Sequence, residues 1–141
     1  MPARTFVGRC PMLIMEDCVF RTTLGIPVSV TPPPERLADR VQLRTAFSTE
    51  RGTVTRFMIQ LEYWLEGDWR EAVRYDHDRD APGGHDITEE GLHRDIYRDG
   101  EKIRSEEVSP PIPANEGFDA AEEDLCKNVE RFIKRFENGT E

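Results

Sequence analysis

Most of the features that identify an enzyme class or a membrane protein are absent from this chain. It has no Gly-x-x-x-x-Gly-Lys phosphate loop, no Gly-x-Ser-x-Gly nucleophile motif, no His-Glu-x-x-His zinc motif and no dinucleotide-binding glycine pattern. No apolar run approaches the ~18 residues of a membrane-spanning helix, and the N-terminal residues lack the form of a secretory signal. The sequence therefore predicts a soluble, cytoplasmic protein and does not by itself name a reaction.

Cysteine is scarce. The chain has three cysteines, Cys10, Cys18 and Cys126, and no Cys-x-x-Cys pair. An odd number without that pair argues against a disulfide framework and a structural zinc site. Because Cys126 lies in a helical pattern, we expect it to be a small apolar filler.

Lysine is also rare. Only Lys102, Lys127 and Lys134 are lysines among 19 basic residues, and 28 acidic residues give a formal net charge of −9. Carboxylates hold water and cations, and molar salt shortens the Debye length to ~3 Å, which screens self-repulsion. This composition predicts an acidic, halophilic protein. It argues against a nucleic-acid partner unless a local site supplies positive charge.

The hydropathy pattern predicts the organisation of the 141-residue chain. Residues 1–22 show no clean period, so we expect a poorly ordered N-terminal segment followed by a single domain over residues 23–141. Three prolines at 32–34 precede an expected helical turn over 35–39. Alternating apolar residues predict strands near 25–30, 41–47, 56–65, 69–76, 92–98 and 102–108.

A C-terminal helix follows from one apolar stripe over residues 121–136. Asp119 and Glu122 form a capping box, and Asn138-Gly139 ends the helix. The expected fold is therefore α+β, with a mostly antiparallel sheet of five or six strands and the C-terminal helix packed on one face.

The first hairpin joins the strands near residues 56–65 and 69–76. A loop at 66–68 places Leu65 opposite Trp69 and Leu61 opposite Val73, whereas a shift of one residue inverts every side chain. The sequence thus predicts which side chains of this hairpin face the core.

The second hairpin turns at Asp99-Gly100, a pair typical of a two-residue type I′ turn. Such a turn sets Ile96 opposite Ile103, with the isoleucines on the core face. The polar face is then expected to carry His93, Asp95, Tyr97, Lys102, Arg104 and Glu106.

The two polar faces join if the hairpins are neighbours in one sheet. The predicted catalytic residues are His93 as acid or base, Arg74 as charge stabiliser and Asp76 as orienter, a set suited to proton transfer beside a phosphate. A solvated face held by cross-strand ion pairs is the alternative. The candidate binding residues on this face are Gln60, Glu62, Trp64, Asp95 and Tyr97.

A divalent-metal site is a further possibility. His77, His85, His93 and Asp76 offer imidazole and carboxylate ligands, which suit zinc, manganese or iron. The ligands are spread over a long polar loop without a fixed metal spacing, so a loop that binds no specific metal remains the alternative. No other cofactor is expected.

Several segments carry a resemblance to known proteins: residues 21–27, 60–64, 73–78, 84–86, 90–93 and 95–100. They resemble a small haloarchaeal domain family of unknown function, which implies no activity. A shorter stretch, Arg74-Tyr75-Asp76 with His93, resembles TumE-type toxins of toxin–antitoxin pairs, and that likeness implies RNA cleavage. The long acidic stretch between His77 and His93 departs from the toxin pattern.

Three hypotheses of function follow. The first is a non-catalytic interaction protein of a halophile, with a protein partner or self-association and no membrane contact. The second is a toxin-like ribonuclease that uses His93, Arg74 and Asp76. The third is a divalent-metal-binding protein, and whether the protein is an enzyme stays open.

Overall fold

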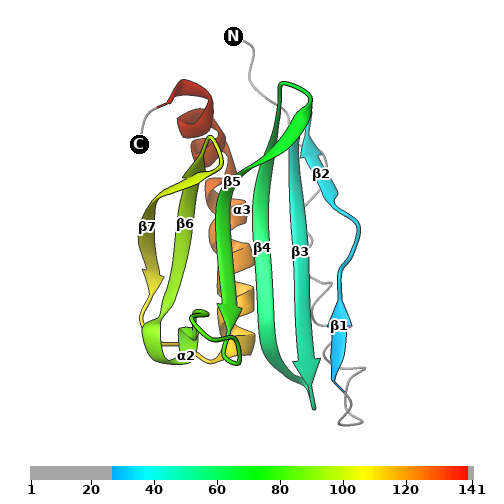
Figure 1. Ribbon diagram of the computed structural model, residues 1–141, viewed down its shortest axis with the longest axis vertical. Coiled ribbons are helices and arrows are strands. Elements are labelled where there is room, and N and C mark those ends of the chain that lie inside the picture. Colours follow the sequence, from blue (N-terminus) through cyan, green and yellow to red (C-terminus); the bar gives the residue numbers. More distant parts are fainter. Residues whose placement is uncertain (1–26, 140–141) are drawn as a thin grey trace.

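Seven antiparallel strands and a long C-terminal helix make up the part of the chain, residues 27–139, that the computed structural model describes (Figure 1). This confirms the expected α+β class, and the segment 1–22 lies outside the described residues. The elements are β1 (Val28–Val30), β2 (Glu35–Ala38), β3 (Val41–Glu50), β4 (Thr53–Leu65), β5 (Asp68–Asp78), α2 (Ile87–Glu90), β6 (Leu92–Arg98), β7 (Glu101–Ser109) and α3 (Ala114–Asn138).

The strands follow the order β1-β3-β4-β5-β6-β7, and β2 also pairs with β3. In Figure 1, β1 and β2 lie one after the other along the outer edge of β3. The expected helical turn over 35–39 is wrong, because this segment forms strand β2. Leu37 and Ala38 are buried there, and pairing with the free edge of β3 satisfies backbone groups that a single helical turn would leave open.

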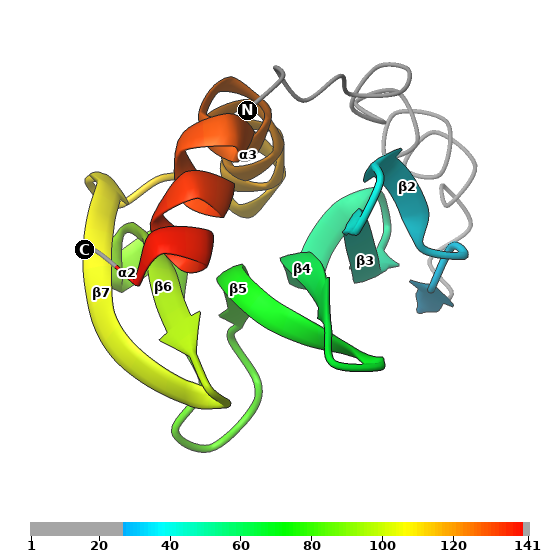
Figure 2. The ribbon, with the colours of Figure 1, turned by 90° about the horizontal axis from the view of Figure 1, so that it is seen from above.

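The helix α3 lies against one face of the curved sheet (Figure 2). Alternation along β4 turns Phe57, Ile59 and Leu61 toward it, and each is at most 1% exposed. Phe118 of α3 fits between Phe47 and Phe57, with ring centroids 5.1 Å away in both pairs. Burial of one such side chain contributes about 1.5–3 kcal/mol, so this cluster fixes the helix on the sheet.

The observed ends of α3 confirm one predicted helix boundary and contradict the other. Gly139 ends the helix with φ 69°, as expected, but the helix begins at Ala114, so the capping box at Asp119 and Glu122 is wrong. Residues 114–118 join the helix because Phe118 is buried in the core. Cys126 is disulfide-bonded, so its expected role as a small apolar filler is wrong, and the odd number of cysteines did not exclude a disulfide.

The β4–β5 hairpin turns one residue earlier than expected. Glu66 and Gly67 take φ values of 54° and 85°, and Leu65 pairs with Asp68. A β-bulge beside Leu61 then restores the expected pair with Val73. The predicted register is therefore correct in the middle of the hairpin and wrong at its tip.

The β6–β7 hairpin has the expected two-residue turn, with Asp99 at φ 54° and Gly100 at φ 81°. A bulge after Ile96 shifts the register, so that Ile96 pairs with Arg104 and not with Ile103. The expected exposure of Arg104 and Glu106 on the polar face is accordingly wrong. Both pair with residues of β6, Ile96 and Arg94, whose side chains lie on the helix side.

Among the described residues, no helix is both long and apolar enough to cross a membrane.

Candidate metal centre

The polar face is the face of the sheet opposite α3, where Gln60, Glu62, Arg74, Asp76 and Asp95 lie. Tyr75 contacts α3 through its hydroxyl group, so its neighbours Arg74 and Asp76 point the other way. Because Arg74 pairs with Asp95 of β6, the carboxylates of Asp76 and Asp95 come from adjacent strands onto this face.

His85 reaches the same place from the segment between β5 and α2. The amide of Asp78 donates a hydrogen bond to the His85 carbonyl oxygen at 2.7 Å, which holds this segment beside the end of β5. Inside the segment, the Gly84 amide donates to the Ala81 carbonyl oxygen at 2.9 Å. The fold of this segment therefore turns the His85 imidazole toward the two strands.

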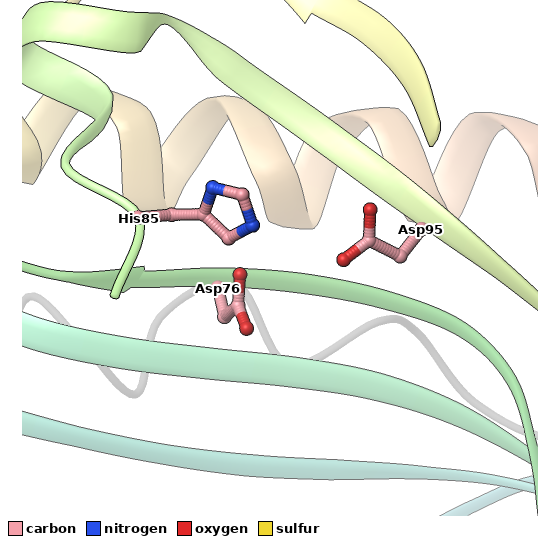
Figure 3. A group of neighbouring side chains, drawn as sticks. All are labelled: Asp76, His85 and Asp95. Atoms are coloured by element: carbon pink, nitrogen blue, oxygen red, sulfur yellow. The ribbon is translucent and has the colours of Figure 1, made fainter. Parts of the chain in front are cut away.

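Asp76, His85 and Asp95 converge, and one ligand atom from each lies within 4.8 Å of the other two (Figure 3). A metal ion with octahedral geometry and bond lengths of about 2.1 Å needs ligand atoms about 3.0–4.2 Å apart. A small side-chain movement would therefore bring the three groups into bonding distance. Two carboxylates and an imidazole suit manganese, zinc or iron.

The electrostatics of Asp76, His85 and Asp95, called the group from here on, favour an added positive charge. Burial raises the pKa of Asp76, and the charge of Asp95 acts in the same direction, while His85 and Arg74 oppose the rise. Asp95 is only 5% exposed. A cation between these carboxylates would offset both the cost of burying the Asp76 charge and its repulsion by Asp95.

Two residues of β7 hold Asp95 in place. The Ser105 hydroxyl donates a hydrogen bond to its Oδ1, and the Lys102 Nζ lies 3.8 Å from its Oδ2. Such neighbours commonly orient metal-binding carboxylates. Asp95 thus has a fixed orientation, with its second oxygen bound only weakly.

Arg74 stands beside the group but is anchored elsewhere. Its Nε donates to Gln60 Oε1 at 2.8 Å, its Nη2 donates to Glu71 Oε2 at 2.8 Å, and its Cζ lies 5.3 Å from the centre of the Tyr97 ring. Burial also raises the pKa of the Tyr97 hydroxyl. Arg74 therefore places a positive charge in a fixed position beside the group of Asp76, His85 and Asp95.

Glu62, one of the predicted binding residues, is buried in a network of its own. Its carboxylate accepts hydrogen bonds from Gln42 and Gln60, both at 2.6 Å, and from Arg44 at 3.1 Å. Glu62 and Gln60 are 5% and 7% exposed. Their polar atoms are used to fix the sheet face and Arg74, which leaves the contacts with a ligand to other residues.

The predicted histidines separate into three places. His85 belongs to the group, whereas His93 lies on the polar face opposite Glu107, outside the group. His77 lies on the core side of β5, where it is 1% exposed and its ring stands 5.7 Å from that of Phe57. Its Nδ1 accepts a hydrogen bond from the Ile87 amide, and burial lowers its pKa.

The sequence analysis did not include Asp95 among the candidate metal ligands and expected it only as a binding residue, whereas the structure places it with Asp76 and His85. The signal was present in the alternation of each strand. Asp76 has the opposite parity to the core residues Val73 and Tyr75, whereas His77 has theirs. Parity alone could thus have excluded His77 from the candidate metal ligands.

The fold and this group define an α+β sheet protein with a candidate divalent-metal centre on its polar face. Residues 34–141 match the model of a family described as a domain of unknown function (DUF7718), and the chain belongs to that family. This confirms the expected membership of a family of unknown function. None of the curated proteins or solved structures matches the chain.

Proposed function

We propose that this protein binds a divalent transition-metal cation through Asp76, His85 and Asp95. The observation that carries the proposal is the convergence, within 4.8 Å, of three ligand groups from β5, β6 and the segment that joins them. The nearby carboxylates of Glu62 and Glu71 have arginine partners. Asp95 has only a long contact with Lys102, at 3.8 Å, so a cation would add to the positive charge that faces Asp76 and Asp95.

Three protein ligands leave coordination positions for water or a bound molecule. A cation held this way supplies a Lewis acid at the surface of the sheet. Arg74 and Lys102 add positive charge at the border of the site, so a ligand with an anionic oxygen is the class of molecule that would complete the coordination. His85 is the ligand that favours manganese, zinc or iron over magnesium.

The test is metal analysis of untagged protein, followed by calorimetric titration with Mn²⁺ and Zn²⁺. We expect Asp76→Asn and His85→Gln each to weaken binding at least about tenfold. The matched control is His93→Gln, which changes a histidine on the same face outside the group and should bind as the unchanged protein does. Circular dichroism spectra verify that each variant is folded.

Equal binding by all four proteins would overturn the proposal, as would an absence of binding to the unchanged protein. Loss of binding in His93→Gln alone would also overturn it, because the metal site would then involve His93 and not the three proposed ligands.

A second candidate function, a toxin-like ribonuclease, draws support from Arg74. Its guanidinium stands over Tyr97 and contributes to the electrostatics of Asp76, where it could stabilise a phosphate in an RNA backbone. In this case expression would arrest growth, and His93→Gln would relieve the arrest although it leaves metal binding intact. Harmless expression at the working salt concentration would exclude this candidate.

The hypothesis of a non-catalytic interaction protein predicts a different result from the metal-binding and ribonuclease hypotheses. If its cellular effect depends on a protein partner or on self-association, Asp76→Asn and His93→Gln leave that effect unchanged in a folded protein. The same variants therefore separate the three hypotheses.

A further inference from the structure

A cleft of about 380 Å³ opens at the far end of the polar face from Asp76. It lies between the turn that joins β2 to β3 and the tip of the β4–β5 hairpin, and its lining residues are Arg36, Asp39, Arg40, Trp64 and Trp69. Its volume lies within the range of small-molecule sites. The cleft shares no residue with the candidate metal centre.

The two tryptophans form one wall of this cleft. Trp64 and Trp69 are paired across the hairpin, with ring centroids 5.3 Å apart and an interplanar angle of 65°. Trp64 is 37% exposed, and it is the one exposed large hydrophobic side chain among the described residues. Its amide donates to the Arg40 carbonyl oxygen at 2.9 Å, which fixes the wall against the β2–β3 turn.

The cleft lining also carries positive charge, from Arg36 and Arg40, that is not used in ion pairs among the described residues. By contrast, the nearby Arg44, Arg70 and Arg74 each pair with a carboxylate, those of Glu62, Glu66 and Glu71. No carboxylate within residues 27–139 comes within 4.0 Å of the guanidinium of Arg36 or Arg40, and Arg36 instead lies 5.1 Å from the centre of the Trp69 ring. In a chain of net charge −9, two such arginines beside an exposed indole point to an anionic aromatic ligand.

We propose that this cleft binds a nucleotide, with the base stacked on Trp64 and the phosphate held by Arg36 and Arg40. An indole face accepts any base through stacking, and a guanidinium matches the geometry of phosphate oxygens. Asp39 adds an acceptor for a base amino group or a ribose hydroxyl. The negative charge of that carboxylate also repels a bare inorganic anion.

Tryptophan fluorescence tests the proposal directly, because Trp64 and Trp69 are the two tryptophans of the chain and both line the cleft. The unchanged protein is titrated with adenosine monophosphate, and with adenosine and inorganic phosphate as separate probes. We expect saturable quenching by the nucleotide at micromolar to millimolar concentration. Each fragment should bind about tenfold more weakly or worse.

Three variants locate the site. Trp64→Leu removes the stacking surface and Arg40→Gln removes one phosphate contact, and each should weaken nucleotide binding about tenfold. Arg131→Gln changes an exposed arginine of α3 and should leave binding unchanged. Calorimetry follows binding in Trp64→Leu, where the reporter itself is altered.

Three results would overturn the proposal. The first two are no quenching by millimolar nucleotide at low salt, and equal affinity for the nucleotide and for adenosine or phosphate alone. Equal loss of affinity in Arg131→Gln would also overturn it, because it would show a general charge effect. The metal ligands are untouched in all of these proteins, so this outcome is independent of the candidate metal centre.

Discussion

Glu122 is a carboxyl group that the fold places where a charge is costly. It lies on α3 and is 4% exposed. Burial, with contributions from Asp119 and Glu35, raises its pKa from 4.5 to about 8. The folded protein therefore keeps a proton that the unfolded chain releases above its ordinary pKa, and the free energy of unfolding falls as the pH rises between about 4.5 and 8.

We predict that Glu122→Gln removes this dependence, because the amide resembles the protonated acid in size and stays neutral. Urea unfolding should give a variant about 1–3 kcal/mol more stable than the unchanged protein at pH about 8.5, with little difference at pH about 5. Glu130→Gln, exposed on the same helix, is the control and should show no such change. A Glu122→Gln variant that is less stable at both pH values would contradict the raised pKa.

Residue parity explains how much of the candidate site the sequence could predict. Arg74, Asp76 and Asp95 were expected on one face, and they lie there because Arg74 pairs with Asp95 in the sheet. The position of His85 could not be predicted, because it depends on tertiary contacts: the Asp78 amide donates to the His85 carbonyl oxygen, and the His85 Nδ1 lies 3.4 Å from Glu90 Oε2. No periodic pattern in a sequence encodes such a contact.

At the scale of the elements, β-bulges limited how well the strand register could be predicted from the sequence. The strands of both hairpins follow from alternation, and the Asp99-Gly100 turn follows from its residue types. A bulge adds one residue to one strand and changes the parity beyond it. For this reason Trp69 stands beside Trp64 and not beside the core, and the cleft at the hairpin tip could not be predicted.

Gly91 connects α2 to β6, and its backbone geometry predicts how a substitution there changes the stability of the fold. Gly91 has φ +85°, and a Cβ atom there would lie 2.5 Å from the Ser109 carbonyl oxygen at the end of β7. Gly91→Ala should therefore lower the free energy of unfolding by about 2–4 kcal/mol, from backbone strain and from separation of α2 and β7.

The matched control is Gly83→Ala. Gly83 has a similar φ of +76° but has nothing within 4 Å of a Cβ atom, so only the cost of the left-handed conformation, about 1–2 kcal/mol, is expected. Thermal and urea unfolding of both variants compare the two costs. Equal destabilisation would show that the close approach of Ser109 does not hold this connection.

At the scale of the whole molecule, the net charge of −9 has two possible consequences for stability in salt. Salt screens the repulsion among the acidic groups, which stabilises the folded state, and it also weakens exposed ion pairs, which destabilises it. The ion pairs of Arg94 with Glu106 and Asp124 are largely buried against α3, so salt screens them little. Net repulsion should therefore dominate.

We predict that the melting temperature rises by about 5 °C or more between low salt and molar KCl. The matched variant combines Glu50→Gln, Asp68→Asn and Glu107→Gln, three exposed positions. Each substitution removes one negative charge, which takes the net charge from −9 to −6, so the variant should melt higher at low salt and gain less from KCl. Equal gains in both proteins would mean that salt acts on apolar burial and not on charge, and a melting temperature that falls with KCl would contradict the halophilic interpretation of the composition.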